Sequence, residues 1–331
     1  MTCLVTLADG RSFLAPPDTS ILMAARAAGL LLEHSCDFGR CGSCRARMIS
    51  GEVKALRETS GLNRSELDAG WVLTCTHAAG SNLQLDTQVL GAAPAAVART
   101  LPARIDSLDL LAPDVIRVRL RLPPSADFRF KAGQHIEVFG PGSVKRRYSM
   151  ASPPATGQSL ELHIRRVAGG VLSRYWFDRA KPQDLLRLRG PLGSFSLRPL
   201  AGVHLVFLAT GTGVAPILSM LGELACQPAA EQPLSTTLYW GGRVPSDLYT
   251  DPQRMGQPAL RFVPVLSRAE DSWAGSRGHV QDVLLDERAN LRHTAVYACG
   301  SSQMIQDARV TLGARELHER HFHFDAFVSS A

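Results

Sequence analysis

The stretch CDFGRCGSC, residues 36–44, gathers three cysteines and two glycines within nine positions. A fourth cysteine, Cys75, follows further along, so four of the seven cysteines in the chain belong to one pattern. In the cytoplasm thiols stay reduced, and clustered cysteines there bind metal or carry out redox chemistry more often than they form disulfides. The pattern therefore predicts a metal or redox centre.

The spacing is Cys36-x4-Cys41-x2-Cys44, followed by Cys75. This is the spacing with which plant-type ferredoxins ligate a 2Fe–2S cluster. Four thiolates suit iron, because soft sulfur donors match the metal and compensate its charge. We expect these four residues to be the metal ligands of a 2Fe–2S cluster.

A structural zinc site, or a set of unrelated buried cysteines, is the alternative. Zinc ribbons usually pair two short CxxC-like knuckles, and the second knuckle is missing here. Gly39 and Gly42 also favour the cluster, since they permit positive φ and turn backbone N–H groups towards the sulfurs. Cys3 and Cys226 lie outside the pattern and are expected to be incidental thiols.

We expect a cytoplasmic protein without a membrane span. The first residues, MTCLVTLADG, have neither a basic start nor an apolar segment of the kind that signal peptides carry. The longest apolar stretch, 203–221, is broken by Gly211, Gly213 and Pro216. The 331 residues are enough for two or three globular domains.

The net charge of +6 is concentrated in the middle of the chain. Residues 101–199 carry 17 Lys and Arg against 8 Asp and Glu, whereas the balance is 8 to 9 over 1–90 and 10 to 13 over 200–331. Because no helix or tail concentrates the excess, we expect no nucleic-acid partner and no membrane partner. A bound polyanionic cofactor explains the basic middle better. We expect a monomer.

The run GAAPAAVART, residues 91–100, lacks hydrophobic periodicity and indicates a linker. We expect three domains, 1–90, 101–199 and 200–331, and this linker lies between the first and the second. The first shows short strands and one helix, SILMAARAAGL, capped by Thr19 or Ser20. In the second domain, apolar and polar residues alternate along the chain, as they do in antiparallel strands. In the third, apolar strands are followed by helices in turn, which is typical of a parallel sheet.

Three motifs of the middle segment are weak individually. They are RRYS (146–149), HIRRVAGGVLS (163–173) and GPLGSF (190–195). A tyrosine beside an arginine in a strand is usually cross-strand packing, and Gly-Pro pairs are usually turns. For Lys145, Arg147, Arg165 and Arg166, a solvated face is the simpler explanation for most.

In this order, the motifs resemble the ferredoxin–NADP reductase family of flavoproteins, in which they belong to a FAD-binding barrel. With the ferredoxin-like part in front, the whole chain resembles the reductase components of bacterial oxygenases and the CDP-6-deoxy-delta-3,4-glucoseen reductases. The resemblance implies a multidomain fold with α+β, all-β and α/β parts. These are a β-grasp ferredoxin domain, an antiparallel flavin-binding β-barrel and a Rossmann-like nucleotide-binding domain.

The resemblance also implies roles at the flavin. Arg146 would pair with the FAD pyrophosphate, Tyr148 would pack against the flavin, and Ser149 would donate a hydrogen bond near flavin N5. FMN or a degenerate site is the alternative. Further residues implied in cofactor binding are His163, Arg165, Gly170, Val171 and Ser173.

In the last segment, LVFLATGTGVAPILSML (205–221) places a glycine-rich turn between a strand and a helix. Such a turn lets the backbone approach a diphosphate at the helix N-terminus, although GTG alone is a weak signal. YWGGR (239–243), DLYTD (247–251), PVLS (264–267) and YACGS (297–301) resemble the nicotinamide-binding half of the same family. The nucleotide-binding residues so implied are Gly211, Thr212, Gly213, Arg243, Cys299 and Gly300.

Three details of this half are open. Thr210 stands where the family often has glycine, which puts nucleotide affinity in doubt. Arg243 would contact either the adenosine ribose or a 2′-phosphate, and because related NADH-using reductases often carry Gly-x-Arg there, NADH is favoured. Phe327, in the family-like end DAFVSS (325–330), would approach the flavin.

The histidines of HERHFHFDAF (318–327) indicate a solvated end strand, with a metal site as the alternative.

Together these features predict an NAD(P)H-dependent reductase. A nicotinamide gives up two electrons as hydride and an iron–sulfur cluster accepts one at a time, so a flavin has to stand between them. We expect Tyr148 to contact the flavin, with Ser149 and Cys299 as polar neighbours of the catalytic transfer path. The final acceptor is a separate redox protein, namely an oxygenase component, a ferredoxin, or an iron–sulfur sugar dehydrase. A redox-sensing module without turnover, or a zinc-binding protein without redox function, is the alternative of another class.

Overall fold

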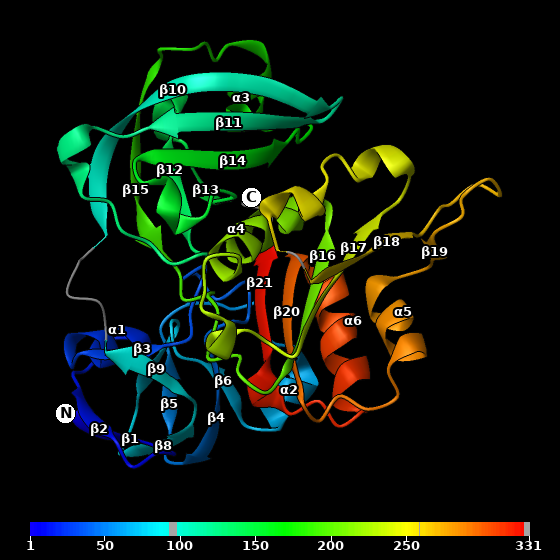
Figure 1. Ribbon diagram of the computed structural model, residues 1–331. Helices are drawn as coiled ribbons and strands as arrows, with labels where there is room; N and C mark the ends of the chain where they lie inside the picture. Colours follow the sequence, from blue (N-terminus) through cyan, green and yellow to red (C-terminus); the bar gives the residue numbers. More distant parts are fainter. Residues whose placement is uncertain (93–97, 258, 328–331) are drawn as a thin grey trace. The chain divides into compact units, whose positions relative to one another are not determined.

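The computed structural model describes residues 1–92, 98–257 and 259–327. Contacts divide the chain into two units, Met1–Val97 with Gly193–Phe195, and Ala98–Leu192 with Ser196–Ala331 (Figure 1). Of the predicted linker, residues 93–97 lie outside the described part, and so do residues 328–330 of DAFVSS.

The first unit is built on a mixed five-stranded sheet in the order β2-β1-β8-β4-β6. Strand β1 pairs antiparallel with β2 and parallel with β8, which is the β-grasp arrangement that was expected. Buried and outward-facing residues alternate along β1, whose sequence is CLVTL, so one face of this strand packs into the core. Within residues 1–92 the strands are β1 Cys3–Leu7, β2 Ser12–Ala15, β3 Leu30–Leu32, β4 Arg45–Ser50, β5 Val53–Ala55, β6 Trp71–Leu73, β7 His77–Ala79, β8 Leu83–Asp86 and β9 Val89–Ala92.

Two short helices complete the first unit. Helix α1, Ile21–Ala27, begins after Ser20, whose Oγ accepts a hydrogen bond from the Met23 N–H at 3.3 Å. The predicted cap is therefore present, and Ile21 and Leu22 are buried in the core of this unit. Helix α2, Arg64–Asp68, begins with a capping box between Asn63 and Glu66.

The second unit contains the predicted antiparallel barrel, with strand order β13-β12-β15-β10-β11-β14. A bridge between Met150 and Leu162 joins the ends of this order. In β11 the aliphatic residues face the core, while Arg117 pairs with Asp109 at 3.1 Å and Arg121 with Asp106 at 2.7 Å. These two arginines are thus paired with carboxylates on the outer surface of the barrel. Its elements are β10 Arg99–Ala112, β11 Val115–Arg121, β12 His135–Phe139, β13 Lys145–Ser149, β14 Ser159–Arg165, α3 Val171–Asp178 and β15 Leu185–Leu192.

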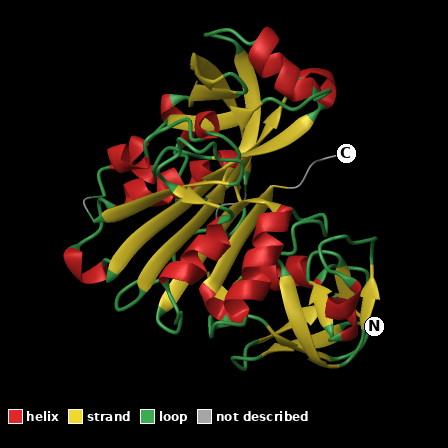
Figure 2. Ribbon diagram, turned by 90° about the vertical axis from the view of Figure 1, so that its right-hand side faces the viewer, coloured by secondary structure: helices red, strands yellow, loops and turns green. Residues whose placement is uncertain are grey.

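The rest of the second unit is the predicted parallel sheet, in the order β19-β18-β17-β16-β20-β21. Figure 2 shows helices on both faces of this sheet. Because β17 and β20 lie on opposite sides of β16, the strand order reverses at β16, and such a switch point is where α/β sheets bind ligands. The elements are β16 His204–Thr210, α4 Val214–Leu224, β17 Ser235–Gly242, β18 Leu260–Leu266, β19 Ser276–Arg277, α5 Val280–Glu287, β20 Thr294–Ser301, α6 Ser302–Gly313 and β21 Phe322–Phe327.

Strand β21 differs from the expected solvated end strand. It pairs parallel with β20 and is largely buried, and the His323 ring packs against Tyr297 at 4.7 Å between ring centroids. The prediction was wrong because an alternating pattern in the sequence of β21 does not show that helix α6 packs against this strand. No three His, Cys, Asp or Glu side chains of the described residues, those of the tail included, are grouped to hold one metal ion.

The barrel and the parallel sheet are in contact within the second unit. Ser219 of α4 donates a hydrogen bond from its Oγ to the Ser152 carbonyl at 2.6 Å. A Cβ added to Gly222 would lie 2.9 Å from the Pro153 side chain, so the helix approaches the barrel closely here. No helix in the described parts of the chain has both the length and the apolar character that crossing a membrane requires.

Replacing Ile105 with alanine should destabilise the barrel. Ile105 of β10 is fully buried, and its truncation leaves a cavity, so we expect the free energy of unfolding to fall by about 2–5 kcal/mol. Leu110 of the same strand is 68% exposed and provides the control. Urea titration of Ile105→Ala and Leu110→Ala, followed by circular dichroism, tests this, and equal losses would contradict it.

Candidate functional site

The four predicted cluster cysteines come together as two pairs of buried sulfurs. The Cys44 thiol donates to the Cys75 Sγ at 3.1 Å. In the other pair, the Cys36 N–H donates to the Cys41 Sγ and the Cys41 N–H to the Cys36 Sγ, each at 3.4 Å. A binuclear cluster needs two such pairs, one for each iron.

The paired arrangement argues against a mononuclear zinc site. A zinc ion takes four ligands around one point. Here the four sulfurs lie as two hydrogen-bonded pairs. This donor set fits a 2Fe–2S cluster, in which each iron takes two cysteine ligands.

Each pair has one sulfur that is easily deprotonated and one that is not. The hydrogen bond from Cys41 lowers the pKa of Cys36 to about 5, and the hydrogen bond from Cys44 lowers the pKa of Cys75. The donor thiols show the opposite change, since donating to the partner and burial raise the pKa of Cys41 and of Cys44. Four neighbouring thiolates would repel one another, so a full set of four requires a cation.

The backbone of the cysteine loop has the predicted conformation. Gly39 and Gly42 both have a φ of +78°, and the Phe38 N–H donates to the Cys36 Sγ at 3.3 Å. Sequence analysis missed Gly61, whose N–H donates to the Gly39 carbonyl at 2.9 Å. A Cβ at Gly61 would lie 2.8 Å from the Gly42 nitrogen, so the 59–61 segment packs directly on the loop.

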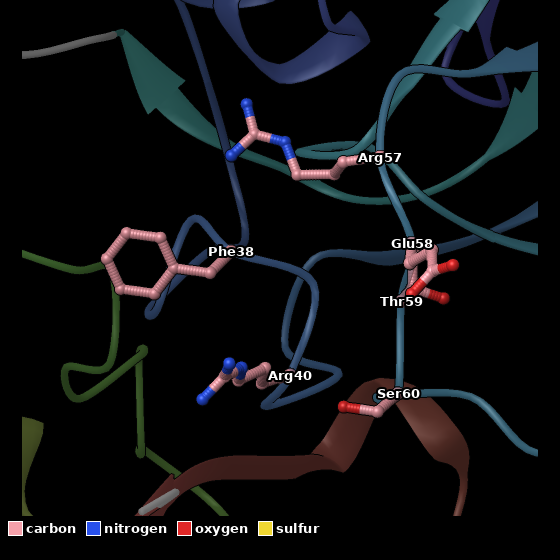
Figure 3. A pocket seen from close by; sticks show the side chains of 6 residues that line it. All are labelled: Phe38, Arg40, Arg57, Glu58, Thr59 and Ser60. Atoms are coloured by element: carbon pink, nitrogen blue, oxygen red, sulfur yellow. The ribbon is translucent and has the colours of Figure 1, made fainter. Parts of the chain in front are cut away.

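A pocket of about 460 Å³ lies beside this loop. The side chains of Phe38, Arg40 and Arg57 extend in the same direction from the two segments that carry them (Figure 3). Arg45, which also follows the loop, is different. It pairs with Glu66 at 3.0 Å and lies over the Trp71 ring at 3.8 Å, so it is a packed residue of the sheet. The pocket is lined by Phe38, Arg40, Arg57, Glu58, Thr59 and Ser60.

Strand β13 carries the predicted flavin-contacting residues. Arg146 and Tyr148 lie opposite Val138 and Ile136 of β12, and therefore on one face of the sheet. The Trp176 indole N–H donates to the Tyr148 hydroxyl at 3.1 Å, and burial raises the pKa of Tyr148 to about 12. The hydroxyl of Tyr148 therefore stays protonated. Ser149, at the end of the strand, is buried.

Gly170, Val171 and Ser173, which were expected to bind the cofactor, lie at the start of helix α3. Gly170 is the N-cap residue and has no side chain to cap the helix, so the first N–H groups face outward from the helix end. The Ser173 hydroxyl accepts a hydrogen bond from the Val167 N–H at 2.7 Å, which closes the loop before the helix. Val171 is the first residue of α3.

The glycine turn lies at the switch point of the parallel sheet. Gly211, Thr212 and Gly213 form a 3-10 turn between β16 and α4. A Cβ at Gly213 would lie 2.2 Å from the Cys299 carbonyl oxygen, so only glycine allows the turn to lie against the end of β20. The turn is thereby brought next to Cys299 and Gly300.

Thr210, which departs from the family pattern, connects the two loops. Its Oγ1 accepts a hydrogen bond from the Ser301 N–H at 3.0 Å. Gly300 has a φ of +137°, and a Cβ there would lie 2.2 Å from the Thr210 Oγ1. Thr210 is therefore accommodated by the loop after β20.

The other predicted residues of this half lie at three places. Cys299 is fully buried, and burial raises its pKa well above the ordinary value, so its thiol stays protonated. Arg243 is exposed and its Nε lies 3.7 Å from Asp247. Phe327 ends β21 with 38% of its surface exposed.

His163 and Arg165 of β14 have side chains that contact the segment after β17. His163 contacts Tyr249, and Arg165 pairs with Asp247. Sequence analysis quoted DLYTD as a family motif without giving Asp247 or Tyr249 a role. Their partners lie more than 80 positions earlier, so no local pattern could have revealed them.

Three family models match successive parts of the chain. Residues 5–80 match the 2Fe-2S iron-sulfur cluster binding domain, 102–197 the oxidoreductase FAD-binding domain, and 207–310 the oxidoreductase NAD-binding domain.

Full-length relatives are also found. The chain is 36% identical over 325 residues to the CDP-6-deoxy-L-threo-D-glycero-4-hexulose-3-dehydrase reductase of Yersinia pestis, covering 97% of each chain. It is 33% identical to reductase component 1 of the terephthalate 1,2-dioxygenase of a Comamonas species, covering 96% of this chain and 95% of that one. Among solved structures, the Amycolatopsis cytochrome P450 reductase GcoB superposes with a TM-score of 0.74 at 30% identity, covering 98% of this chain and 99% of that chain.

Replacing Gly213 with alanine should impair the use of NADH. The new Cβ would collide with the backbone at Cys299 and displace the glycine turn, so we expect the KM for NADH to rise by about tenfold or more while flavin content stays unchanged. Gly313→Ala is the control, because a Cβ there meets nothing within 4 Å. Steady-state reduction of ferricyanide tests this, and an unchanged KM in Gly213→Ala would contradict it.

Proposed function

Because the chain belongs to the ferredoxin–NADP reductase family of flavoproteins and carries an amino-terminal 2Fe–2S domain, we propose that it delivers single electrons to the oxygenase component of a multicomponent oxygenase. The chain itself is an NAD(P)H-dependent flavin and iron–sulfur oxidoreductase. Its electrons pass from NAD(P)H to FAD, then to the 2Fe–2S cluster and to a separate acceptor. The flavin is needed because it accepts a hydride and releases electrons one at a time.

The observation that carries the proposal is the position of the two sulfur pairs beneath an exposed loop. Cys36, Cys41, Cys44 and Cys75 are the proposed cluster ligands. Phe38, only two residues after Cys36, is 48% exposed. A cluster held here would lie close below the surface of the first unit, which an electron donor to another protein requires, since electron transfer slows steeply with distance.

The residues present also fit a flavin. We assign Arg146 to the FAD pyrophosphate, since a guanidinium binds phosphate oxygens in a bidentate fork. The uncapped start of α3, where Gly170 is the N-cap residue, offers the Val171 N–H and the Ser173 hydroxyl as donors to the same group. His163 and Arg165 of β14 are assigned to the wall of this site.

Three residues are assigned to the catalytic path. Tyr148 would contact the flavin with its ring, and its protonated hydroxyl remains a donor. Ser149 and Cys299 would be its polar neighbours. The raised pKa of Cys299 supports this role, because a protonated thiol is a poor nucleophile.

The nucleotide would lie at the switch point of the parallel sheet. Gly211, Thr212 and Gly213 begin the approach to α4, where backbone N–H groups can receive a diphosphate. We assign Cys299 and Gly300 to the nicotinamide end. The remaining assignments are Arg243 to the adenosine part and Phe327 to the flavin.

A second candidate acceptor is an iron–sulfur dehydrase acting on a CDP-sugar. The observation that favours it is the 36% identity to the Yersinia pestis reductase over nearly the whole chain. Both acceptors take single electrons, so the cofactor sites serve either. A monomeric state, a cytoplasmic location, the preference for NADH and the domain boundaries stay predictions.

Loss of one cluster ligand should stop electron transfer through the cluster and leave the reduction of the flavin by NADH intact. In Cys75→Ser we expect the 2Fe–2S absorbance and the reduction of cytochrome c to be lost, while NADH still bleaches the flavin and ferricyanide reduction persists. Cys226→Ser, which alters an exposed thiol, is the control. A visible spectrum before and after anaerobic NADH is the measurement. A colourless wild-type protein, or one that NADH does not bleach, would contradict the proposal.

The acceptor can be tested by reoxidation of the reduced protein. We expect an oxygenase component of the terephthalate dioxygenase type to reoxidise the cluster at least about tenfold faster than a CDP-hexulose dehydrase does. Anaerobic stopped-flow mixing of NADH-reduced protein with each purified acceptor measures both rates. The reverse order would favour the dehydrase as acceptor.

A further inference from the structure

Barrel strand β14 and the nucleotide-binding half are joined by a partly buried hydrogen bond. The Nδ1 of His163 lies 3.1 Å from the Tyr249 hydroxyl, and its Nε2 lies 3.0 Å from the Glu161 carboxylate. The His163 side chain is only 2% exposed. Both ring nitrogens of His163 thus have a partner.

The chemistry of these groups sets the direction of the bonds. Burial would raise the pKa of Glu161, but the hydrogen bonds from His163 and Arg119 lower it, so the carboxylate is ionised and only accepts. In neutral His163 the Nε2 therefore carries the proton, and Nδ1 accepts from the Tyr249 hydroxyl. Burial raises the pKa of Tyr249 well above its ordinary value, which keeps this donor protonated.

Tyr249 also connects to the glycine turn. Its ring packs edge-on against Trp240, with the centroids 5.1 Å apart and an angle of 89°. The Trp240 indole N–H donates to the Gly211 carbonyl at 3.0 Å. A continuous series of contacts therefore runs from His163 through Tyr249 and Trp240 to the start of the turn.

A second contact runs parallel to the first. Arg165, two residues after His163, pairs with Asp247 at 2.7 Å, two residues before Tyr249. Asp247 in turn accepts from the Arg243 N–H at 2.8 Å. A Cβ at Gly211 would lie 3.1 Å from the Arg165 guanidinium, so the turn and the barrel strand are close neighbours.

We propose that Tyr249 is a positioning residue for hydride transfer, which holds the glycine turn at a set distance from barrel strand β14. Flavin and nicotinamide are assigned to opposite sides of this contact, and hydride transfer is sensitive to displacements of an ångström or less. The inference rests on the assignment of Gly211–Gly213 to the nucleotide.

The test compares two tyrosines that each lose one buried hydroxyl. Tyr249→Phe removes the bond to His163 and keeps the ring on Trp240. Tyr239→Phe is the control, because Tyr239 donates to Glu287 of α5 and not to the barrel. We expect anaerobic flavin reduction by NADH to slow about tenfold in Tyr249→Phe, with a larger isotope effect from 4-deuterated NADH and a KM within about threefold of wild type. Tyr239→Phe should keep the wild-type rate.

Two further measurements separate positioning from general damage. Amide hydrogen exchange over residues 211–213 should rise in Tyr249→Phe and not in Tyr239→Phe. The double variant His163→Leu/Tyr249→Phe, loaded with flavin, should be no slower than the slower single variant, since each change removes the same hydrogen bond between His163 and Tyr249. A wild-type rate in Tyr249→Phe, equal slowing in Tyr239→Phe, or additive losses would overturn the inference. If Gly213→Ala also left NADH use unchanged, the nucleotide assignment itself would fail.

Discussion

The placement of four buried sulfurs in two close pairs is the constraint on which the first unit depends. Without a cation the four cysteines cannot all be thiolates. In each pair, the hydrogen bond to the paired cysteine and burial raise the pKa of one thiol, that of Cys41 or Cys44. A 2Fe–2S cluster would remove this conflict, with each pair of cysteines as the ligands of one iron. The close contact of Gly61 with the loop and the positive φ of Gly39 and Gly42 are the backbone adjustments that hold the pairs in place.

In the second unit, the comparable constraint is the close approach of two loops at the switch point of the parallel sheet. The glycine turn after β16 lies against the backbone at Cys299, and no side chain fits between them. Thr210 is accommodated because its hydroxyl accepts from the Ser301 N–H. Its side chain therefore adds a contact between the two loops.

The barrel and the parallel sheet of the second unit are joined by side-chain contacts, and two of the residues involved, His163 and Arg165, are also assigned to the flavin site. Ser219 contacts Ser152, Arg165 pairs with Asp247, and His163 contacts Tyr249, each between the barrel and the parallel sheet. A reductase of this kind has to keep nicotinamide and flavin at a reactive distance, and a few polar contacts between well-packed halves achieve this. The arginines of β11, by contrast, form ion pairs on the barrel surface.

The sequence by itself determined the local features: the cluster motif, the Ser20 cap, the alternating strands and the glycine turn, because spacing and periodicity report on neighbours along the chain. It also determined the family, and with it the three kinds of fold. Only the tertiary structure decided which residues meet from distant positions. The pairing of Cys44 with Cys75, the packing of Gly61 on the cysteine loop, the burial of His323 and the contact of Tyr249 with His163 all arise between segments far apart in the chain. Such contacts depend on how whole strands and helices pack, which no local pattern encodes.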